Sequence, residues 1–194
     1  MKMILRYSRP LLLGMSLVCL PLMAFAQSGD TGISQDKMSN SNMSASDKKF
    51  VRDAAQGGMA EVELGRLAAE KATSDDVKKF GQRMVDDHSK ANDQLKQIAS
   101  SQGIDVPQDL NSKDKALKTR LSKLNGASFD KVYMESMVKD HKADVADFTK
   151  ESNSGKDDAI KQFATSTLPT LKDHLREAER IEPMMKGSST RASK

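Results

Sequence analysis

Apolar residues in the central part of this chain recur at intervals of three and four positions, and no stretch alternates with a period of two. This spacing places the apolar side chains on one face of a helix. We therefore expect four long amphipathic helices, at about residues 47–72, 75–102, 128–152 and 157–181, with a shorter one at 115–124. Four long helices in a chain of this length predict an all-α, four-helix bundle.

Residues at the start of the second helix and on the apolar face of the first add detail to this prediction. Thr73 or Ser74 is a suitable cap for the second helix, because short polar side chains accept hydrogen bonds from the first backbone N–H groups. The first helix has small residues on its apolar face, including Gly58 and Gly65. We expect these small residues to let a neighbouring helix approach closely.

Both ends of the chain differ from this pattern. Residues 1–26 have a basic start, a short apolar run and an Ala-Phe-Ala site, which is typical of a secretory signal peptide. Residues 27–46 are rich in Ser, Asn and Gly and predict a disordered tether. We expect a bundle domain at 47–182 and a disordered tail at 183–194.

Removal of the expected leader changes the charge and the cysteine content. The whole chain has a net charge of +4, but the leader holds three basic and no acidic residues, which leaves 28 basic against 27 acidic residues, or +1. The single cysteine, Cys19, also lies in the leader, so the mature chain would have no thiol or disulfide. Because the mature chain has no Trp and no basic patch with interleaved aromatic residues, we expect no nucleic-acid partner.

The three histidines all occur in Asp-His pairs, at the ends of the similar segments MVDDH, MVKDH and TLKDH. These histidines are His88, His141 and His174, and each lies on the apolar face of a different expected helix. The first helix carries Glu61 on a stripe of small residues, whereas Glu63 lies on a neighbouring stripe. We expect Glu61, with Glu63 as the alternative, to face the core beside the three histidines.

The depth of these residues along their helices favours one chain order. At a rise of about 1.5 Å per residue, all four would lie in the central third of the bundle if the segment 104–126 returned the chain to the end where the second helix begins. A plain up-down-up-down order would place His174 far from the others. The sequence therefore favours a crossover between the second and third long helices, with the short helix inside it.

Four segments carry a family resemblance: FVRDAAQGGMAEVELGRLAAEKA, VKKFGQRMVDDHSKANDQLKQIA, GASFDKVYMESMVKDH and FATSTLPTLKDHLREAERI. Over about residues 47–182 the chain resembles the exported family called domain of unknown function 4142, whose members are often labelled predicted outer-membrane proteins. The resemblance implies a ferritin-like helical bundle in the periplasm or at the outer membrane. It implies no established activity.

Two observations bear on metal chemistry. Di-metal carboxylate bundles use Glu-x-x-His motifs, but apolar residues stand three positions before each histidine here, which disfavours di-iron ferroxidase chemistry. Met84 and Met137 stand four positions before two of the histidines, and imidazole with thioether ligands suits copper, particularly Cu(I). One hypothesis is therefore a mononuclear metal site of the three histidines, completed by Glu61 or a methionine.

The alternative is a hydrogen-bonded core network without metal, since buried imidazoles commonly pair with carboxylates. The neighbouring aspartates could accept the second ring N–H of a histidine on another helix under either hypothesis. We expect an exported, non-catalytic protein that binds copper or another transition metal, or else an envelope interaction module whose histidines hold the helices in register. After removal of the leader, the sequence contains no further expected transmembrane segment.

Overall fold

The computed structural model describes residues 43–188, so the expected leader and most of the tether lie outside the described residues. The described part is all-helical and contains no strand. It has four long helices and one short one: α1 (Ala45–Lys71), α2 (Asp75–Ser101), α3 (Ser112–Ser122), α4 (Gly126–Ser154) and α5 (Asp158–Ser188).

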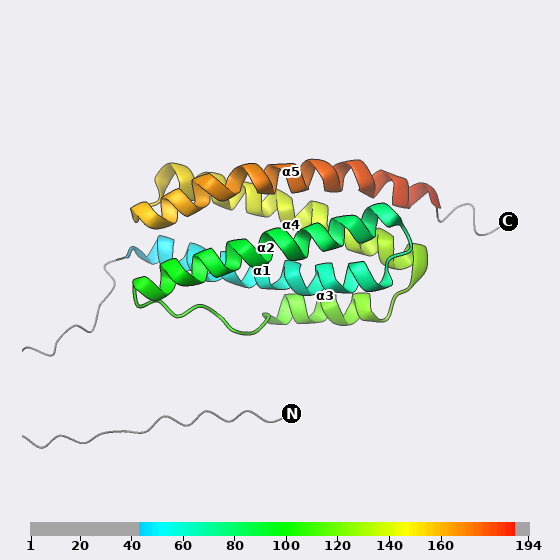
Figure 1. The fold of residues 1–194 in the computed structure, drawn as a ribbon, viewed down its shortest axis with the longest axis horizontal. Helices are drawn as coiled ribbons and strands as arrows, with labels where there is room; N and C mark the ends of the chain where they lie inside the picture. The colour runs from blue at the N-terminus through cyan, green and yellow to red at the C-terminus, as the bar shows by residue number, and fades with distance from the viewer. Residues whose placement is uncertain (1–42, 189–194) are drawn as a thin grey trace, which may run out of the picture. The chain divides into compact units, whose positions relative to one another are not determined.

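The four long helices lie side by side in two antiparallel pairs, α1 with α2 and α4 with α5 (Figure 1). After α2 the chain returns along the outside of the molecule through α3, which lies beside α1 and α4. Helix α4 therefore begins at the same end as α2 and runs in the same direction (Figure 1). This is the crossover order that the depths of the histidines and Glu61 favoured.

Two glycines let α1 and α2 approach closely. A Cβ added to Gly65 would lie 2.6 Å from the carbonyl oxygen of Gly81, and one added to Gly81 would lie 2.8 Å from the Cβ of Ala68. Neither distance leaves room for a methyl group. The small residues on the first helix thus have the packing role expected from the sequence.

Each of the two tight connections is held by an aspartate from the other helix pair. The carboxylate of Asp130 on α4 accepts backbone N–H bonds from Thr73 (3.1 Å) and Ser74 (2.9 Å) at the start of α2. Asp47 on α1 accepts backbone N–H bonds from Lys156 (3.1 Å) and Asp157 (2.8 Å) before α5. Ser74 occupies the N-cap position of α2, as predicted, but its side chain makes no capping hydrogen bond.

The last helix is longer than its sequence pattern indicated. We expected it to end near Ile181 and a disordered tail to begin at residue 183. Instead, α5 continues to Ser188 with Pro183 inside it. Met185 is buried one turn beyond Ile181 and joins the same apolar cluster, so packing extends the apolar stripe past the proline. None of the described helices is long and apolar enough to cross a membrane.

The apolar core is divided into two clusters along the length of the four helices. One contains Leu64 of α1, Met84 of α2, Met137 of α4 and Ala178 of α5. The other contains Val51, Leu95, Phe148 and Leu171 from the same four helices. On every long helix, the residue singled out by the sequence lies between the members of these two clusters, so a polar layer separates them.

Candidate metal centre

Four buried polar residues, one from each long helix, make up this layer: Glu61, His88, His141 and His174. Glu61 and His88 are 4% and 6% exposed, and the other two histidines are fully buried. The His ring centroids lie 5.2 Å to 5.7 Å apart. We call these four residues the central cluster.

Glu61 contacts two of the three histidines. Its Oε2 lies 2.9 Å from Nδ1 of His88, within hydrogen-bonding distance, and its Oε1 lies 3.4 Å from Nε2 of His141. Glu63, the alternative considered from the sequence, is only half-buried and pairs with Lys118 of α3 at 2.5 Å. The preference for Glu61 as the inward carboxylate is therefore confirmed.

The other two histidines have their own outer partners. Nδ1–H of His141 donates to the backbone carbonyl of Met137 (3.0 Å), one turn earlier on α4. Nε2–H of His174 donates to Oδ2 of Asp87 on α2 (2.9 Å). Asp87 follows the expectation that an aspartate next to one histidine serves a histidine on another helix.

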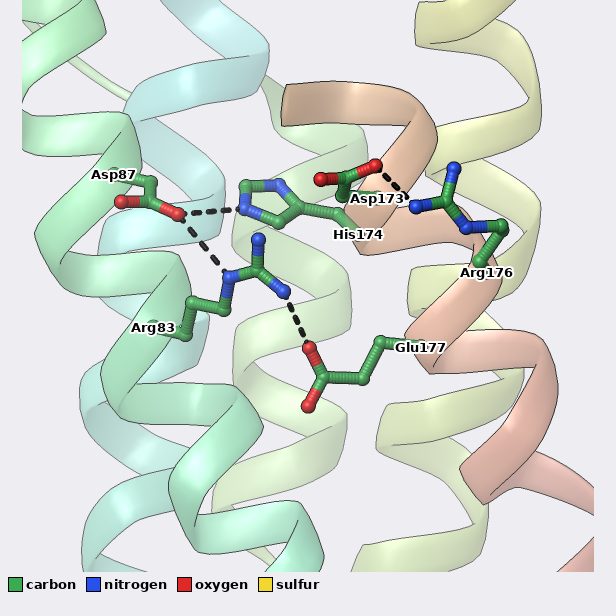
Figure 2. A network of polar contacts seen from close by, with 6 residues as sticks. All are labelled: Arg83, Asp87, Asp173, His174, Arg176 and Glu177. Carbon is green, nitrogen blue, oxygen red and sulfur yellow. Dashed lines mark hydrogen bonds and ion pairs between the residues drawn. The ribbon is translucent and has the colours of Figure 1, made fainter. Parts of the chain in front are cut away.

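Asp87 is itself held in place by a polar network between α2 and α5 (Figure 2). The guanidinium of Arg83 contacts Asp87 at 3.3 Å and Glu177 at 2.6 Å, so it links the two helices beside the buried ring of His174. Asp173 points away from this network and pairs with Arg176. Only one of the three aspartates in the Asp-His pairs therefore supports a histidine, since Asp140 pairs with Lys113.

Burial keeps the histidines neutral. Desolvation lowers the pKa of His88 and of His174 to about 4, and it also lowers the pKa of His141. A neutral imidazole has one N–H and one nitrogen with a free lone pair. The outer partners place the N–H on Nδ1 of His88, on Nδ1 of His141 and on Nε2 of His174.

The three remaining nitrogens therefore present lone pairs: Nε2 of His88, Nε2 of His141 and Nδ1 of His174. All three are buried and lack a hydrogen-bond partner among the described residues. One ligand atom of each histidine lies within 4.8 Å of those of the other two. Three neighbouring imidazoles that each keep one nitrogen without a hydrogen-bond partner suit a metal ion, because a His ligand usually donates its other N–H to an outer partner.

A further carboxylate lies at the edge of the cluster. Asp144, half-buried on α4, offers an oxygen within 4.8 Å of ligand atoms of Glu61 and His141. Burial raises the pKa of Glu61 to about 6 and raises that of Asp144. Asp144 was not among the site residues expected from the sequence, although its spacing of three residues after His141 on one helix face was an available signal.

Met84 and Met137, which we proposed as additional ligands, are fully buried in the apolar cluster next to the central cluster. The structure assigns Met137 a contact through its backbone carbonyl, which orients His141. A role for either sulfur in binding an ion remains a prediction.

Comparisons with known proteins agree with an all-helical fold. The family described as domain of unknown function (DUF4142) matches residues 33–181. A DUF305 fragment from Deinococcus radiodurans is similar in structure (TM-score 0.65, 13% identity, covering 73% of this chain and 98% of that one). So is a DUF305 protein from Streptomyces coelicolor, provisionally described as secreted (TM-score 0.63, 13% identity, 73% and 92% coverage). A comparison with curated proteins finds no match.

Proposed function

Because this chain belongs to the DUF4142 family, whose function is unknown, we propose from its own residues that it binds a transition-metal ion in the central cluster. His88, His141 and His174 supply the nitrogen ligands, and Glu61 is the adjacent carboxylate. Copper is the favoured ion, with Met84 or Met137 as a further soft ligand. The protein is an ion-holding, non-catalytic component of the cell envelope, exported by its leader, with a ferritin-like four-helix bundle.

One observation carries this proposal: three buried imidazoles come within metal-binding distance of one another, and each has one nitrogen without a hydrogen-bond partner. Leaving a buried polar atom without a partner costs about 1–3 kcal/mol. Three such atoms in one layer would therefore lower the stability of the folded protein considerably. An ion accepting all three lone pairs removes that cost.

The same observation weighs against the rival function, an interaction module in which the histidines only hold the helices in register. A hydrogen-bonded network would supply a donor for each unpartnered nitrogen, yet the histidine N–H groups are already taken by Glu61, Asp87 and the Met137 carbonyl, and no histidine donates to another. Outer carboxylate and carbonyl partners of this kind fix the orientation of metal-binding imidazoles. The rival predicts stability that does not depend on any ion.

The arrangement also bears on which ion binds. Three imidazoles suit copper and zinc, whereas magnesium and calcium prefer oxygen ligands alone. The Glu-x-x-His motifs of di-iron bundles are missing, because Val85, Val138 and Leu171 occupy the relevant positions. Ferroxidase chemistry is therefore not part of the proposal.

A thermal melt of the mature protein, purified without a His tag, tests the proposal. The melt is run without added ion and with Cu(I), Cu(II), Zn(II) or Fe(II), alongside elemental analysis. An ion present at about 100 times its Kd should stabilise the fold by about 2.7 kcal/mol. At about 2–4 °C per kcal/mol for a chain of this size, Tm should rise by about 5–10 °C.

Two variants make the result specific. His174→Ala should abolish the ion-dependent rise in Tm. Tyr133→Phe is the matched control, because it also removes a buried, unpartnered polar atom but lies outside the central cluster, so it should keep the full rise. A wild-type protein that copurifies with no metal and shows no shift with any of the four ions would refute the proposal and favour the register-holding network.

A further inference from the structure

An acidic cavity of about 220 Å³ leads to the central cluster from the side of α1, α3 and α4. Five carboxylates and one lysine line it: Asp53, Glu61, Asp114, Asp140, Asp144 and Lys113. The Lys113 ammonium lies 3.3 Å from Asp140, so it offsets one carboxylate and leaves the others in excess. A concave surface lined by charges of one sign concentrates ions of the opposite sign.

Glu61, which lines this cavity, brings an unpartnered oxygen close to an unpartnered nitrogen of His141. Oε1 of Glu61 and Nε2 of His141 are buried and make no hydrogen bond among the described residues. Ligand atoms of Glu61, His141 and Asp144 lie within 4.8 Å of one another. The Glu61 oxygen and the His141 nitrogen lie 3.4 Å apart, and a cation between them would satisfy both.

We propose that Glu61, His141 and Asp144 form a second cation position, through which a divalent metal ion enters the three-histidine site. His141 belongs to both positions and has only Nε2 free, because its Nδ1–H donates to Met137. One ion therefore moves inward by exchanging Asp144 for His88 and His174, while it keeps His141. This inference rests on the proposed function and adds the route by which the ion arrives.

The opposite side of the molecule is a poorer entrance. A cavity of about 360 Å³ between α2 and α5 also reaches His88 and His174. Its lining includes one carboxylate, that of Asp87, which is already bonded to His174 and Arg83, and it also includes Lys90. The carboxylates that attract and first hold a cation thus lie on the α1 and α4 side.

The test uses the mature wild-type protein and the variants Asp144→Asn, His174→Ala and His141→Ala. Asp147→Asn is the matched control, because it makes the same charge change on an exposed residue of α4, one turn further along. Mn²⁺, which prefers oxygen ligands, probes the outer position by electron paramagnetic resonance. Zn²⁺ released from a chromophoric chelator probes both the affinity and the loading rate of the inner site.

We expect the variants to affect the outer and the inner cation positions differently. Asp144→Asn should weaken Mn²⁺ binding and slow Zn²⁺ loading by about tenfold, the lower end of the loss on removing a group that supports a metal site. His174→Ala should keep Mn²⁺ binding but lose tight Zn²⁺ binding, and His141→Ala should impair both. Asp147→Asn should behave as the wild type.

Different results would refute the outer cation position and the proposed function of the inner site. If the wild type binds Zn²⁺ tightly and Asp144→Asn matches it in Mn²⁺ affinity and in loading rate, the outer position is overturned and the inner site stands. If the wild type binds none of Cu(I), Cu(II), Zn(II) and Fe(II), the proposed function itself fails.

Discussion

The close approach of α1 and α2 can be tested with two glycines on the same helix. Gly65 faces α2, and an added Cβ would meet the Gly81 carbonyl at 2.6 Å and the Met84 Cβ at 3.1 Å. Gly57, two turns earlier, would place a Cβ in open space with nothing within 4 Å. Gly65→Ala and Gly57→Ala therefore make the same chemical change in opposite surroundings.

The expected magnitudes follow from two opposing effects. Alanine is favoured over glycine in a helix interior by about 1 kcal/mol, so Gly57→Ala should stabilise the protein by up to that amount. At Gly65 the obstructing atom is backbone, and overpacking of this kind costs about 1–3 kcal/mol. Taking the upper half of that range and subtracting the helix preference, we expect Gly65→Ala to lower the free energy of unfolding by about 1–2 kcal/mol.

Urea unfolding followed by circular dichroism, with a thermal melt alongside, measures both changes. The two variants should differ by about 2–3 kcal/mol, or about 6–9 °C in Tm at about 3 °C per kcal/mol. Gly81→Ala should resemble Gly65→Ala, because its Cβ would meet Ala68 and the Gly65 carbonyl at 2.8 Å. If Gly65→Ala stabilised the protein as much as Gly57→Ala, the close packing of α1 against α2 would be refuted.

Three further predictions concern aspartates that act across helix pairs. Asp130→Ala should destabilise the protein by about 1–2 kcal/mol in urea unfolding, because the N–H groups at the start of α2 lose their acceptor; an unchanged midpoint would contradict this role. Burial raises the pKa of Asp47, but hydrogen bonds from Ser44 and from two backbone N–H groups outweigh it and hold the pKa below its usual value. Its stabilisation should therefore be present above about pH 4 and lost as the pH falls through the folded-state pKa. The gap in unfolding free energy between wild type and Asp47→Asn should narrow below that pH, and a constant gap would argue against ionised Asp47. Asp87→Asn should weaken Cu or Zn binding by about tenfold in a chelator competition while leaving the fold intact, and equal affinity would exclude Asp87 as the outer partner of His174.

In each of the two helix pairs, an aspartate accepts backbone hydrogen bonds from the connection between the helices of the other pair. Asp47 of α1 holds the start of α5, and Asp130 of α4 holds the start of α2. Each carboxylate lies near the beginning of its own helix and bonds to backbone of the other pair. Such bonds fix the two pairs relative to each other, and this keeps the central cluster assembled from all four long helices.

The sequence by itself determined the helices and the inward position of the central cluster. An apolar stripe of period 3.6 depends only on neighbouring residues, so the periodicity located all five helices. Most of the helix ends lie within a few positions of the expected ones, and the end of α5 is the exception. His88, His141 and His174 could be placed on the inward stripes by the same local reasoning. Because rise per residue is constant along a helix, even the order of the chain followed from their depths.

The tertiary structure alone decided the chemistry of that layer. Which nitrogen of His174 carries the proton depends on Asp87, 87 residues earlier in the chain. Asp144 lies beside Glu61 only because α1 and α4 are neighbours, and Asp130 accepts the N–H groups of Thr73 and Ser74 because α4 packs against the α1–α2 connection. Periodicity determines which face of a helix turns inward, but hydrogen-bond partners and shared ligands are set by the packing of helices that are distant in sequence.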